Sequence, residues 1–398
     1  MKKDLEIQGL TAGSQFIDVA RAVILDRLDN MLLHEPGVRE GVDIESLHDM
    51  RVYSRRLREA LKIFSMCYRK KDFKDIASRV RDVTKALGEV RNLDVFIAYF
   101  KQFNETEDPD PARAAAADSL ISWAGERRHG LRETMIQDLD SLDTESLAED
   151  IRTMVQNPKC EDPHALMQRF AAQGLPVVQP GGPGAGIENA ELVTVRPGDA
   201  GFAESVTHEL LRRGCIKQKE FKEYRDLARK ILETPPGDNL PLLCADPVSD
   251  HARKLIHERL DAVAALWNQA LASRDAPEMD ILHALRICFK KIRYGLEVLY
   301  SAFDQEKRDA VYERIKNFQD ILGDLHDAEV FYGLSCDKMK QAVKKDHSES
   351  AIGYALLANK LRIRRDDLIK TFYQTVDEYS LQSFQQDIND SLVSEMSA

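Results

Sequence analysis

The sequence predicts an all-α protein that consists of two four-helix-bundle-like modules related by internal pseudo-two-fold symmetry. Three observations support this prediction. Aromatic residues make up only 7% of the 398 residues, and long β-branched runs are absent, which favours helices over strands. Long proline-free stretches carry apolar residues at helical spacing. One part of the chain also repeats a residue pattern found in another part, as expected for a duplicated module.

The repeat appears when the chain is shifted by 235 residues. Segment Leu47–Leu61 then lies on Leu282–Leu296, with histidine, basic and apolar residues at matching positions. The same shift, without a gap, places Gly88 on Gly323. A single amphipathic helix cannot bury its apolar face alone, so the helices of each copy are expected to pack into a bundle.

Composition suggests the domain boundaries. We expect a first helical module over 14–139, intervening helices with a Gly/Pro-rich linker over 140–245, and a second module over 246–378. Residues 171–205 hold seven glycines and four prolines, a composition typical of loops. A second interruption of the helical pattern is expected at residues 235–238. The expected helices are 14–35, 46–69, 71–104, 111–139, 142–156, 203–233, 248–272, 277–303, 305–345 and 349–378.

A stripe of basic residues borders the apolar face of the helix expected at 46–69. At about 100° per residue, its members fall within a sector of about 80°. They are His48, Arg51, Arg55, Arg58 and Lys62 in the first copy, and His283, Arg286, Lys290 and Arg293 in the second. We call these sets the first stripe and the second stripe. Arg56 and Lys291 lie on the other flank of their helices.

Both stripes carry charge of nearly one sign, which suits a phosphate-rich polyanion. Four like charges on one helix face repel one another, whereas a solvated helix usually alternates the two signs. Arginine also donates two parallel hydrogen bonds to phosphate and stays protonated. A basic run is often just a solvated face, but its recurrence at the same helix edge favours binding.

The charge balance limits the partners. The formal net charge is −11, which argues against general binding to nucleic acid or anionic membranes. Residues 47–91 nevertheless hold thirteen basic and six acidic residues. The expected site is therefore a local basic feature on an acidic protein.

The start of the first stripe helix is expected to add to this site. Ser46 and Asp49 have the spacing of a capping box, which would place His48 in the first helical turn, where free backbone N–H groups favour anions. In the second copy either Asp275 or Asp280 is a candidate cap.

A second repeated motif contains a glycine within an expected helix. Gly88 and Gly323 are interpreted as structural, because a helical glycine costs about 1 kcal/mol and usually permits close packing. Asp94 and Glu329 occupy matching positions and are expected to orient the stripe arginines. The residues expected to support the stripes are Lys62, Arg81, Asp94, Lys316 and Glu329.

These motifs resemble those of the CHAD family, the conserved-histidine α-helical domain. The resemblance rests on H-x-x-R-x-x-x-[RK]-[RK]-x-R at His48 and His283, and on L-G-x-x-[RH]-[ND] at Leu87 and Leu322. It implies two helical bundles around a basic groove or pore that binds inorganic polyphosphate. The implied ligand-binding residues are His48, Arg51, Arg55, Arg56, Arg58, His283, Arg286, Lys290, Lys291 and Arg293. The chain departs from the family's motif pattern at Asn92, His326 and Glu329. These departures affect the predicted supporting residues more than the two stripes.

The expected function is thus non-catalytic polyphosphate binding. The alternatives are a phosphotransfer or phosphohydrolase enzyme that uses the histidines, and a metal-binding scaffold. No Gly-rich phosphate loop of the P-loop type is present, so no catalytic residue, metal or cofactor is expected.

We expect a cytoplasmic location and, if the chain binds polyphosphate, association with polyphosphate granules, with no specific nucleic acid and no membrane as partner. The start of the chain lacks the apolar core of a signal peptide, and no segment approaches roughly 18 consecutive apolar residues. The six cysteines lack disulfide or zinc-site spacing and are expected to be free thiols.

Overall fold

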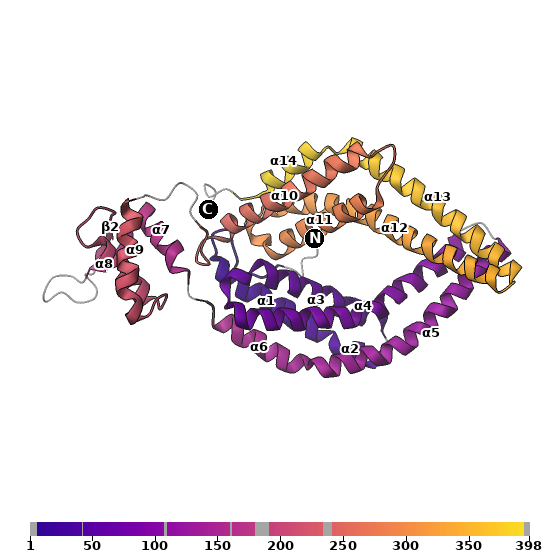
Figure 1. The fold of residues 1–398 in the computed structure, drawn as a ribbon, viewed down its shortest axis with the longest axis horizontal. Coiled ribbons are helices and arrows are strands. Elements are labelled where there is room, and N and C mark those ends of the chain that lie inside the picture. The colour runs from indigo at the N-terminus through magenta and orange to yellow at the C-terminus, as the bar shows by residue number, and fades with distance from the viewer. Residues whose placement is uncertain are drawn as a thin grey trace.

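The computed structural model describes residues 6–41, 43–106, 110–159, 161–179, 191–233 and 241–393, and most of these residues are helical (Figure 1). The first half contains α1 (Phe16–Leu33), α2 (Glu35–Glu40), α3 (Ile44–Ile63), the 3₁₀ helix η2 (Ser65–Cys67), α4 (Lys70–Thr106), α5 (Pro111–Leu142) and α6 (Thr144–Gln156). The second half contains α10 (Val248–Ala272), α11 (Met279–Val298), η5 (Tyr300–Ala302), α12 (Gln305–Lys344), α13 (Ser348–Glu378) and α14 (Leu381–Ser391). No helix of the described ranges is long and apolar enough to cross a membrane.

Equivalent helices follow one another in the two halves. α3 and α11 are both 20 residues long and begin 235 residues apart. The same offset separates η2 from η5 and the start of α4 from that of α12. The sequence repeat therefore has the same secondary structure in both copies, while their relation by a two-fold axis stays a prediction.

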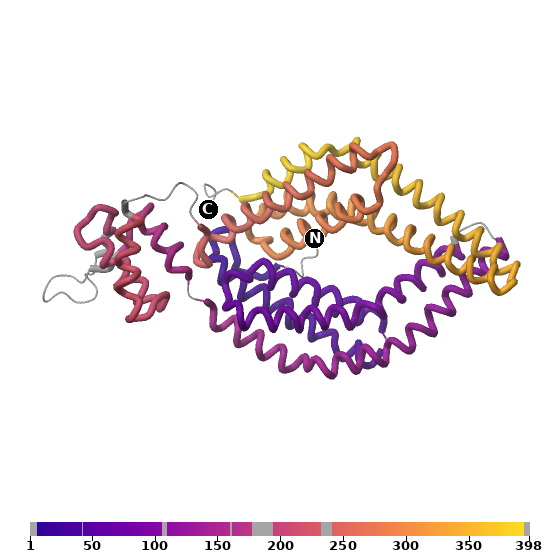
Figure 2. Tube along the Cα trace, in the orientation of Figure 1, coloured from indigo at the N-terminus to yellow at the C-terminus, as the bar shows by residue number. Residues whose placement is uncertain are grey.

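The two halves meet at both ends of the molecule (Figures 1 and 2). At one end a single apolar core includes α1 and α3 of the first half and α10 and α11 of the second. At the other end α4, α5, α12 and α13 share a smaller core, in which Phe96 contacts Phe331 at a ring-centroid distance of 5.0 Å. Between these contacts, α3 and α4 diverge from α11 and α12 (Figure 1). Two separate cores thus hold the two stripe helices at a fixed spacing.

The first core extends beyond the expected module boundary at residue 139. Leu147, Ile151 and Val155 of α6 belong to it. In the second half, Phe384 and Ile388 of α14, a helix that the sequence did not predict, join the same core. A short last helix therefore completes the packing of each half.

The start of α3 differs from the prediction. Asp43 is the N-cap, and its carboxylate accepts a hydrogen bond from Glu45 N at 2.9 Å. His48 consequently lies in the second turn, and the predicted capping box at Ser46 is wrong. In the second half Glu278 occupies the N-cap position without a side-chain hydrogen bond, so neither Asp275 nor Asp280 caps α11. The expected helix-dipole contribution at His48 is accordingly withdrawn.

An inserted unit separates the halves. It contains α7 (Pro163–Gln173), strands β1 (Leu175–Gln179) and β2 (Glu191–Val195), α8 (Phe202–Arg212), η4 (Gln218–Glu220) and α9 (Phe221–Glu233). The strands pair antiparallel within the segment expected to be a loop, and the single helix expected at 203–233 is interrupted at Gly214, which has a φ of 70°. The Gly/Pro-rich residues 180–184 and 235–238 lie outside the described residues.

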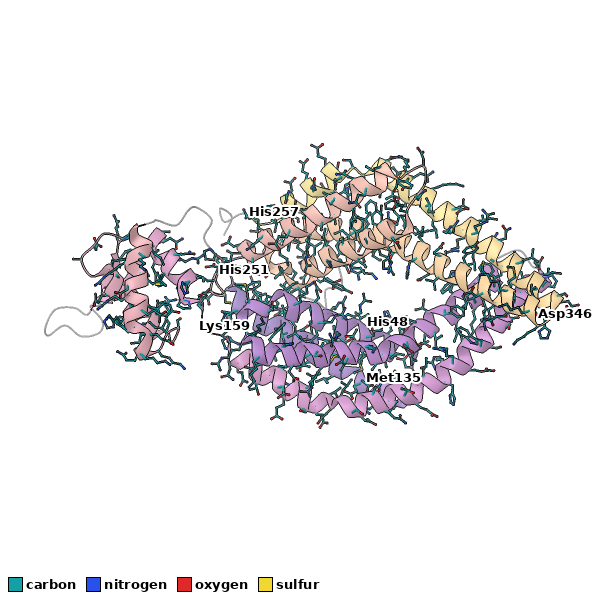
Figure 3. All side chains as sticks on the ribbon, viewed as in Figure 1. His48, Met135, Lys159, His251, His257 and Asp346 are labelled. Carbon is teal, nitrogen blue, oxygen red and sulfur yellow. The ribbon has the colours of Figure 1, made fainter. Side chains whose placement is uncertain are left out.

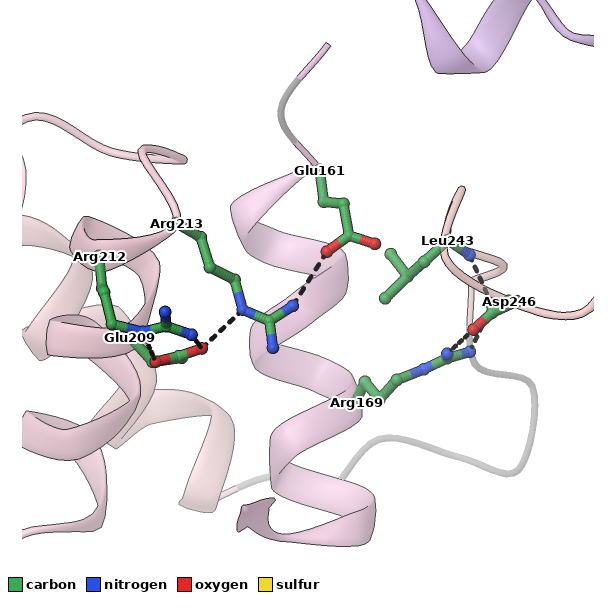
Figure 4. A network of polar contacts seen from close by, with 7 residues as sticks. All are labelled: Glu161, Arg169, Glu209, Arg212, Arg213, Leu243 and Asp246. Carbon is green, nitrogen blue, oxygen red and sulfur yellow. Dashed lines mark hydrogen bonds and ion pairs between the residues drawn. The ribbon is translucent and has the colours of Figure 1, made fainter. Parts of the chain in front are cut away.

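The inserted unit has its own small apolar core and a polar connection to the second half. Arg169 of α7 forms an ion pair with Asp246, which also accepts a hydrogen bond from Leu243 N (Figure 4). Arg213 bridges Glu209 of α8 and Glu161 ahead of α7 (Figure 4). The first pair attaches α7 to the segment that leads into α10, and the contacts of Arg213 hold the end of α8 near the start of α7.

Candidate functional site

The two stripes approach each other across the boundary between the halves. The guanidinium carbon of Arg55 on α3 lies 5.9 Å from the ring centroid of Tyr294 on α11, and that of Arg293 lies 5.5 Å from the same ring. A groove of about 540 Å³ runs between α3 and α11, with Arg55, Arg58 and Lys290 in its lining. Lys62 and Lys291 also line this groove. Parts of both stripes thus share one surface.

The positive charges in the groove perturb one another. Burial, and then the charges of Arg286 and Arg55, lower the pKa of Lys290 to about 7. Burial, and then Arg55 and Arg91, lower the pKa of Arg51 to about 10. Among the described residues, no carboxylate forms an ion pair with Arg51, Arg55, Arg58, Arg286 or Lys290. The centre of the site therefore carries positive charge that is only weakly compensated.

Each half places an arginine against the glycine of its repeated motif. A Cβ atom on Gly88 of α4 would lie 3.9 Å from Arg51 Nε, and one on Gly323 of α12 would lie 3.8 Å from Arg286 Nε. Both Nε atoms are buried, and neither has a hydrogen-bond partner within the described part of the chain. Both glycines thus lie beside the stripe arginines, but a Cβ at either position would make only an ordinary van der Waals contact, so this geometry does not require glycine and their predicted role in close packing stays a prediction.

The histidines of the two stripes have different surroundings. Arg91 Nε donates a hydrogen bond to Nδ1 of the half-buried His48 at 3.1 Å, which leaves the proton of a neutral imidazole on Nε2. Burial, and then Arg91, lower the pKa of His48. His283 is exposed, and its ring lies 4.7 Å from that of His326. Burial, and then Arg286, lower the pKa of His326.

The acidic residues of the second motif do not orient the stripes as predicted. Asp94 forms an ion pair with Arg128 of α5, and Glu329 forms one with Arg365 of α13 at 3.1 Å. Both carboxylates therefore tie α4 and α12 to the helices that pack beside them. Arg51 instead donates a hydrogen bond to Asn92 at 3.3 Å.

Arg56 lies apart from the groove and connects the two halves. Its Nε donates to Glu297 of α11 at 3.0 Å, and Glu297 is only 1% exposed. A second ion pair, between Glu59 and Arg259 at 2.7 Å, also joins the halves, and the same arginine donates to the Lys291 carbonyl. Because its guanidinium already has a buried partner, we leave Arg56 out of the ligand set.

Replacing Arg56 by methionine is expected to lower the free energy of unfolding by about 3 kcal/mol, because the buried Glu297 loses its closest cationic partner and keeps only Tyr312 and the more distant Arg293. Arg58→Met, on the exposed side of α3, is the control and is expected to change it by less than about 1 kcal/mol. Urea denaturation of the two variants measures the difference. Equal losses would mean that the Arg56–Glu297 pair does not hold the halves together.

The remaining predicted residues lie at the edges of the site. Arg81 is exposed, donates to Ser78 at 2.9 Å and is not among the residues that line the groove. Lys316 is exposed on α12, and its Nζ lies 3.8 Å from Glu313. Sequence reasoning missed Tyr294, whose ring is contacted by the guanidinium groups of Arg55 on α3 and Arg293 on α11. Its spacing of four residues from Lys290 places it on the same helix face, and this was the available signal.

Comparisons with known proteins agree with this architecture. The CHAD domain family model matches residues 22–176 and 209–334. The crystal structure of the CHAD domain from the plant Ricinus communis is 18% identical, with a TM-score of 0.54, and the match covers 94% of this chain and 95% of that one. PptA from Streptomyces chartreusis is 12% identical over 92% of this chain and 100% of that chain, with a TM-score of 0.47. A search of curated proteins found no match. Because the family model covers more than half of the sequence, the chain belongs to the CHAD domain family.

Proposed function

We propose that this chain binds inorganic polyphosphate without catalysis, along the groove between the first and second stripes. The observation that carries the proposal is the convergence of basic residues from α3 and α11 on one surface, where burial, and then the neighbouring positive charges, lower the pKa of Lys290 to about 7. Such mutual repulsion costs stability unless a polyanion neutralises it. The family resemblance points to the same ligand.

The ligand-facing groups have separate roles in this proposal. Arg55, Arg58 and Lys290 line the groove and neutralise phosphate charge. Arg51 and Arg286 lie deeper, beside the glycines, and supply buried N–H donors that lack a protein partner within the described residues. A neutral His48 adds an Nε2–H donor, because its Nδ1 already accepts from Arg91. Charge thus attracts the polyanion, and the buried donors fix its path.

Isothermal titration of the full chain with long-chain polyphosphate tests the proposal. Saturable binding that weakens as salt concentration rises is expected, because each neutralised phosphate releases counterions. Duplex DNA at the same phosphate concentration serves as the competitor and is expected to displace little polyphosphate. Absence of saturable binding at low salt would contradict the proposal.

Binding is expected to be tighter at pH 6 than at pH 8 or 9. The pKa of Lys290 is about 7 in the free protein, and a bound polyanion raises it towards or above its ordinary value of about 10.4. Binding therefore takes up protons above pH 7, and affinity falls by up to about tenfold per pH unit in that range. Because burial and then Arg91 lower the pKa of His48, this residue becomes positively charged only below its ordinary value of about 6.5. Its charge then adds a smaller gain in affinity at low pH.

Titration calorimetry at several pH values, in buffers with different ionisation enthalpies, measures both affinity and proton uptake. The variant Lys290→Arg keeps the charge and is expected to flatten the profile above pH 7, since arginine stays protonated. A wild-type profile that is flat from pH 6 to pH 9 would show that Lys290 does not contact the ligand.

A phosphate-release assay distinguishes binding from the enzymatic alternative. Phosphoryl transfer usually needs carboxylates that hold Mg²⁺, and the described residues contain no cluster of three His, Cys, Asp or Glu side chains fit to hold a metal ion. No release of orthophosphate is therefore expected. We also propose that the chain acts in the cytoplasm at polyphosphate granules, and co-localisation of a fluorescently tagged chain with stained polyphosphate tests this.

A further inference from the structure

A second basic cavity lies beside the groove, on the first half of the molecule. It has a volume of about 850 Å³ and is lined by η2, the first three turns of α4 and Lys159. Lys159 lies where the first half leads into the inserted unit (Figure 3). The cavity and the groove share Ser65, Phe73 and Ala77 in their linings, so they adjoin but present different side chains.

The lining combines positive charge with an apolar surface. The basic residues are Arg69, Lys70, Lys74, Arg81 and Lys159, and no carboxylate is among the lining residues. Lys70, Lys74 and Arg81 occur at helical spacing on α4, so they share one face of the helix. Met66, Tyr68 and Phe73 supply the apolar part. A chain made only of phosphate units has no group that would use this apolar surface.

Tyr68 contributes apolar surface to the cavity. The residue lines the cavity and is only 2% exposed. Its hydroxyl group is buried without a hydrogen-bond partner within the described ranges, and such a group usually has a partner. The ionisable groups that act on this hydroxyl are Cys67, Arg21 and Cys244, none of which lines the cavity, so we assign the hydroxyl no contact with a ligand there.

The second half does not repeat this cavity. A shift of 235 residues places Arg69, Lys74 and Ser78 on Asp304, Asp309 and Glu313, so the local charge is reversed. There, Arg308 replaces Phe73 and forms an ion pair with Glu6 at 2.5 Å. The hydroxyl of Tyr300 donates to the Ile7 carbonyl at 2.7 Å. The N-terminal segment thus contacts this region in one half, while the equivalent region of the other half is an open basic cavity.

We infer that this cavity binds an organic phosphate with an aromatic body, of the class of the nucleoside triphosphates. Lys70, Lys74 and Arg81 would neutralise the phosphates, while Phe73 and Met66 contact the base. This site is additional to the polyphosphate groove, and the inference does not depend on polyphosphate binding.

Titration of the full-length Arg51→Glu, Arg55→Glu variant, in which the polyphosphate groove is disabled, with adenosine triphosphate and with inorganic tripolyphosphate, at equal ionic strength, tests the inference. The two probes carry similar charge, and only the first has a base. Adenosine triphosphate is expected to bind about tenfold more tightly, the typical effect of stacking one base on an aromatic ring. Phe73→Leu keeps an apolar side chain and is expected to remove this preference while leaving tripolyphosphate binding unchanged. Equal binding of the two probes by this groove-disabled variant would overturn the inference.

Two charge-reversal variants separate the cavity from the groove. Lys74→Glu with Arg81→Glu is expected to weaken adenosine triphosphate binding at least tenfold and long-chain polyphosphate binding less than threefold. Arg51→Glu with Arg55→Glu is expected to weaken long-chain polyphosphate binding at least tenfold and adenosine triphosphate binding less than threefold. The control Lys340→Glu with Lys370→Glu makes the same net charge change at exposed lysines of α12 and α13. If the cavity variant binds adenosine triphosphate as the control does, the inference is wrong. A variant that loses only polyphosphate binding, and keeps adenosine triphosphate binding, tests the groove and leaves the inference about the cavity standing.

Discussion

The double variant Arg51→Glu with Arg55→Glu is expected to bind long-chain polyphosphate roughly 100-fold more weakly than the wild-type chain at low salt. Two contacts that attract phosphate become repulsive, so the loss exceeds that of the corresponding alanine variant. The slope of log affinity against log salt concentration is expected to fall by about 0.7 per lost contact, the value for flexible single strands. Titration calorimetry over a salt series measures both quantities.

The folded state is expected to survive this reversal. Both arginines contribute, after burial, to the lowered pKa of Lys290, so negative charge at these positions relieves repulsion. Helical content and melting temperature should stay near those of the wild type, as for the control Lys340→Glu with Lys370→Glu. Wild-type affinity in the variant would mean that the first stripe is only a solvated helix face. Unfolding would mean that these arginines serve mainly the packing of α3.

Long-chain polyphosphate is expected to bind at least roughly 100-fold more tightly than orthophosphate. The helix rises about 1.5 Å per residue, so His48 and Arg58 are separated by roughly 15 Å along α3. Several phosphate units fit this length, whereas a single phosphate uses a small part of the charge. Affinity should therefore rise with chain length and level off once the groove is filled.

Competition titrations with polyphosphates of graded length measure this dependence. Adenosine triphosphate is compared in the Lys74→Glu, Arg81→Glu variant, in which the adjoining cavity is disabled, and is expected to bind the groove far more weakly than long chains. Affinity that does not change between orthophosphate and long chains would mean that one small anion site, rather than an extended groove, accounts for binding.

The helical architecture and both stripes were predictable because they depend on local sequence. Helical periodicity assigned α3 and α11, and the one-sided charge of residues such as Arg55 and Lys290 followed from their spacing. The match of the family model and the likeness to a solved CHAD domain confirm the family and the fold. The approach of the two stripes required the packing of one half on the other, which one helix cannot reveal.

Side-chain partners were predicted less well for the same physical reason. Arg56 has the same residue type as its neighbour Arg55, yet it points to the other flank and meets the buried Glu297. Asp94 was expected to orient an arginine of the stripe but pairs with Arg128 of α5. In both cases the partner comes from a helix distant in sequence, so no local pattern identifies it.

The inserted unit shows a second reason why some elements could not be predicted from the sequence. β1 and β2 are only five residues long, and their flanking glycines and prolines indicated a loop. The short helices α7 and α14 likewise lack a periodic pattern long enough to distinguish them from irregular chain. Such elements are stabilised by tertiary packing, as the buried Phe170 and Phe384 indicate.

The structure of the chain in complex with a polyphosphate of defined length is the most direct test of the central claim. One ligand chain is expected to lie between α3 and α11, with phosphate oxygens within hydrogen-bond distance of Arg55 and Lys290, and with Arg51 Nε as a deeper donor. A polyphosphate bound elsewhere on the surface, with both stripes free of phosphate, would contradict the account.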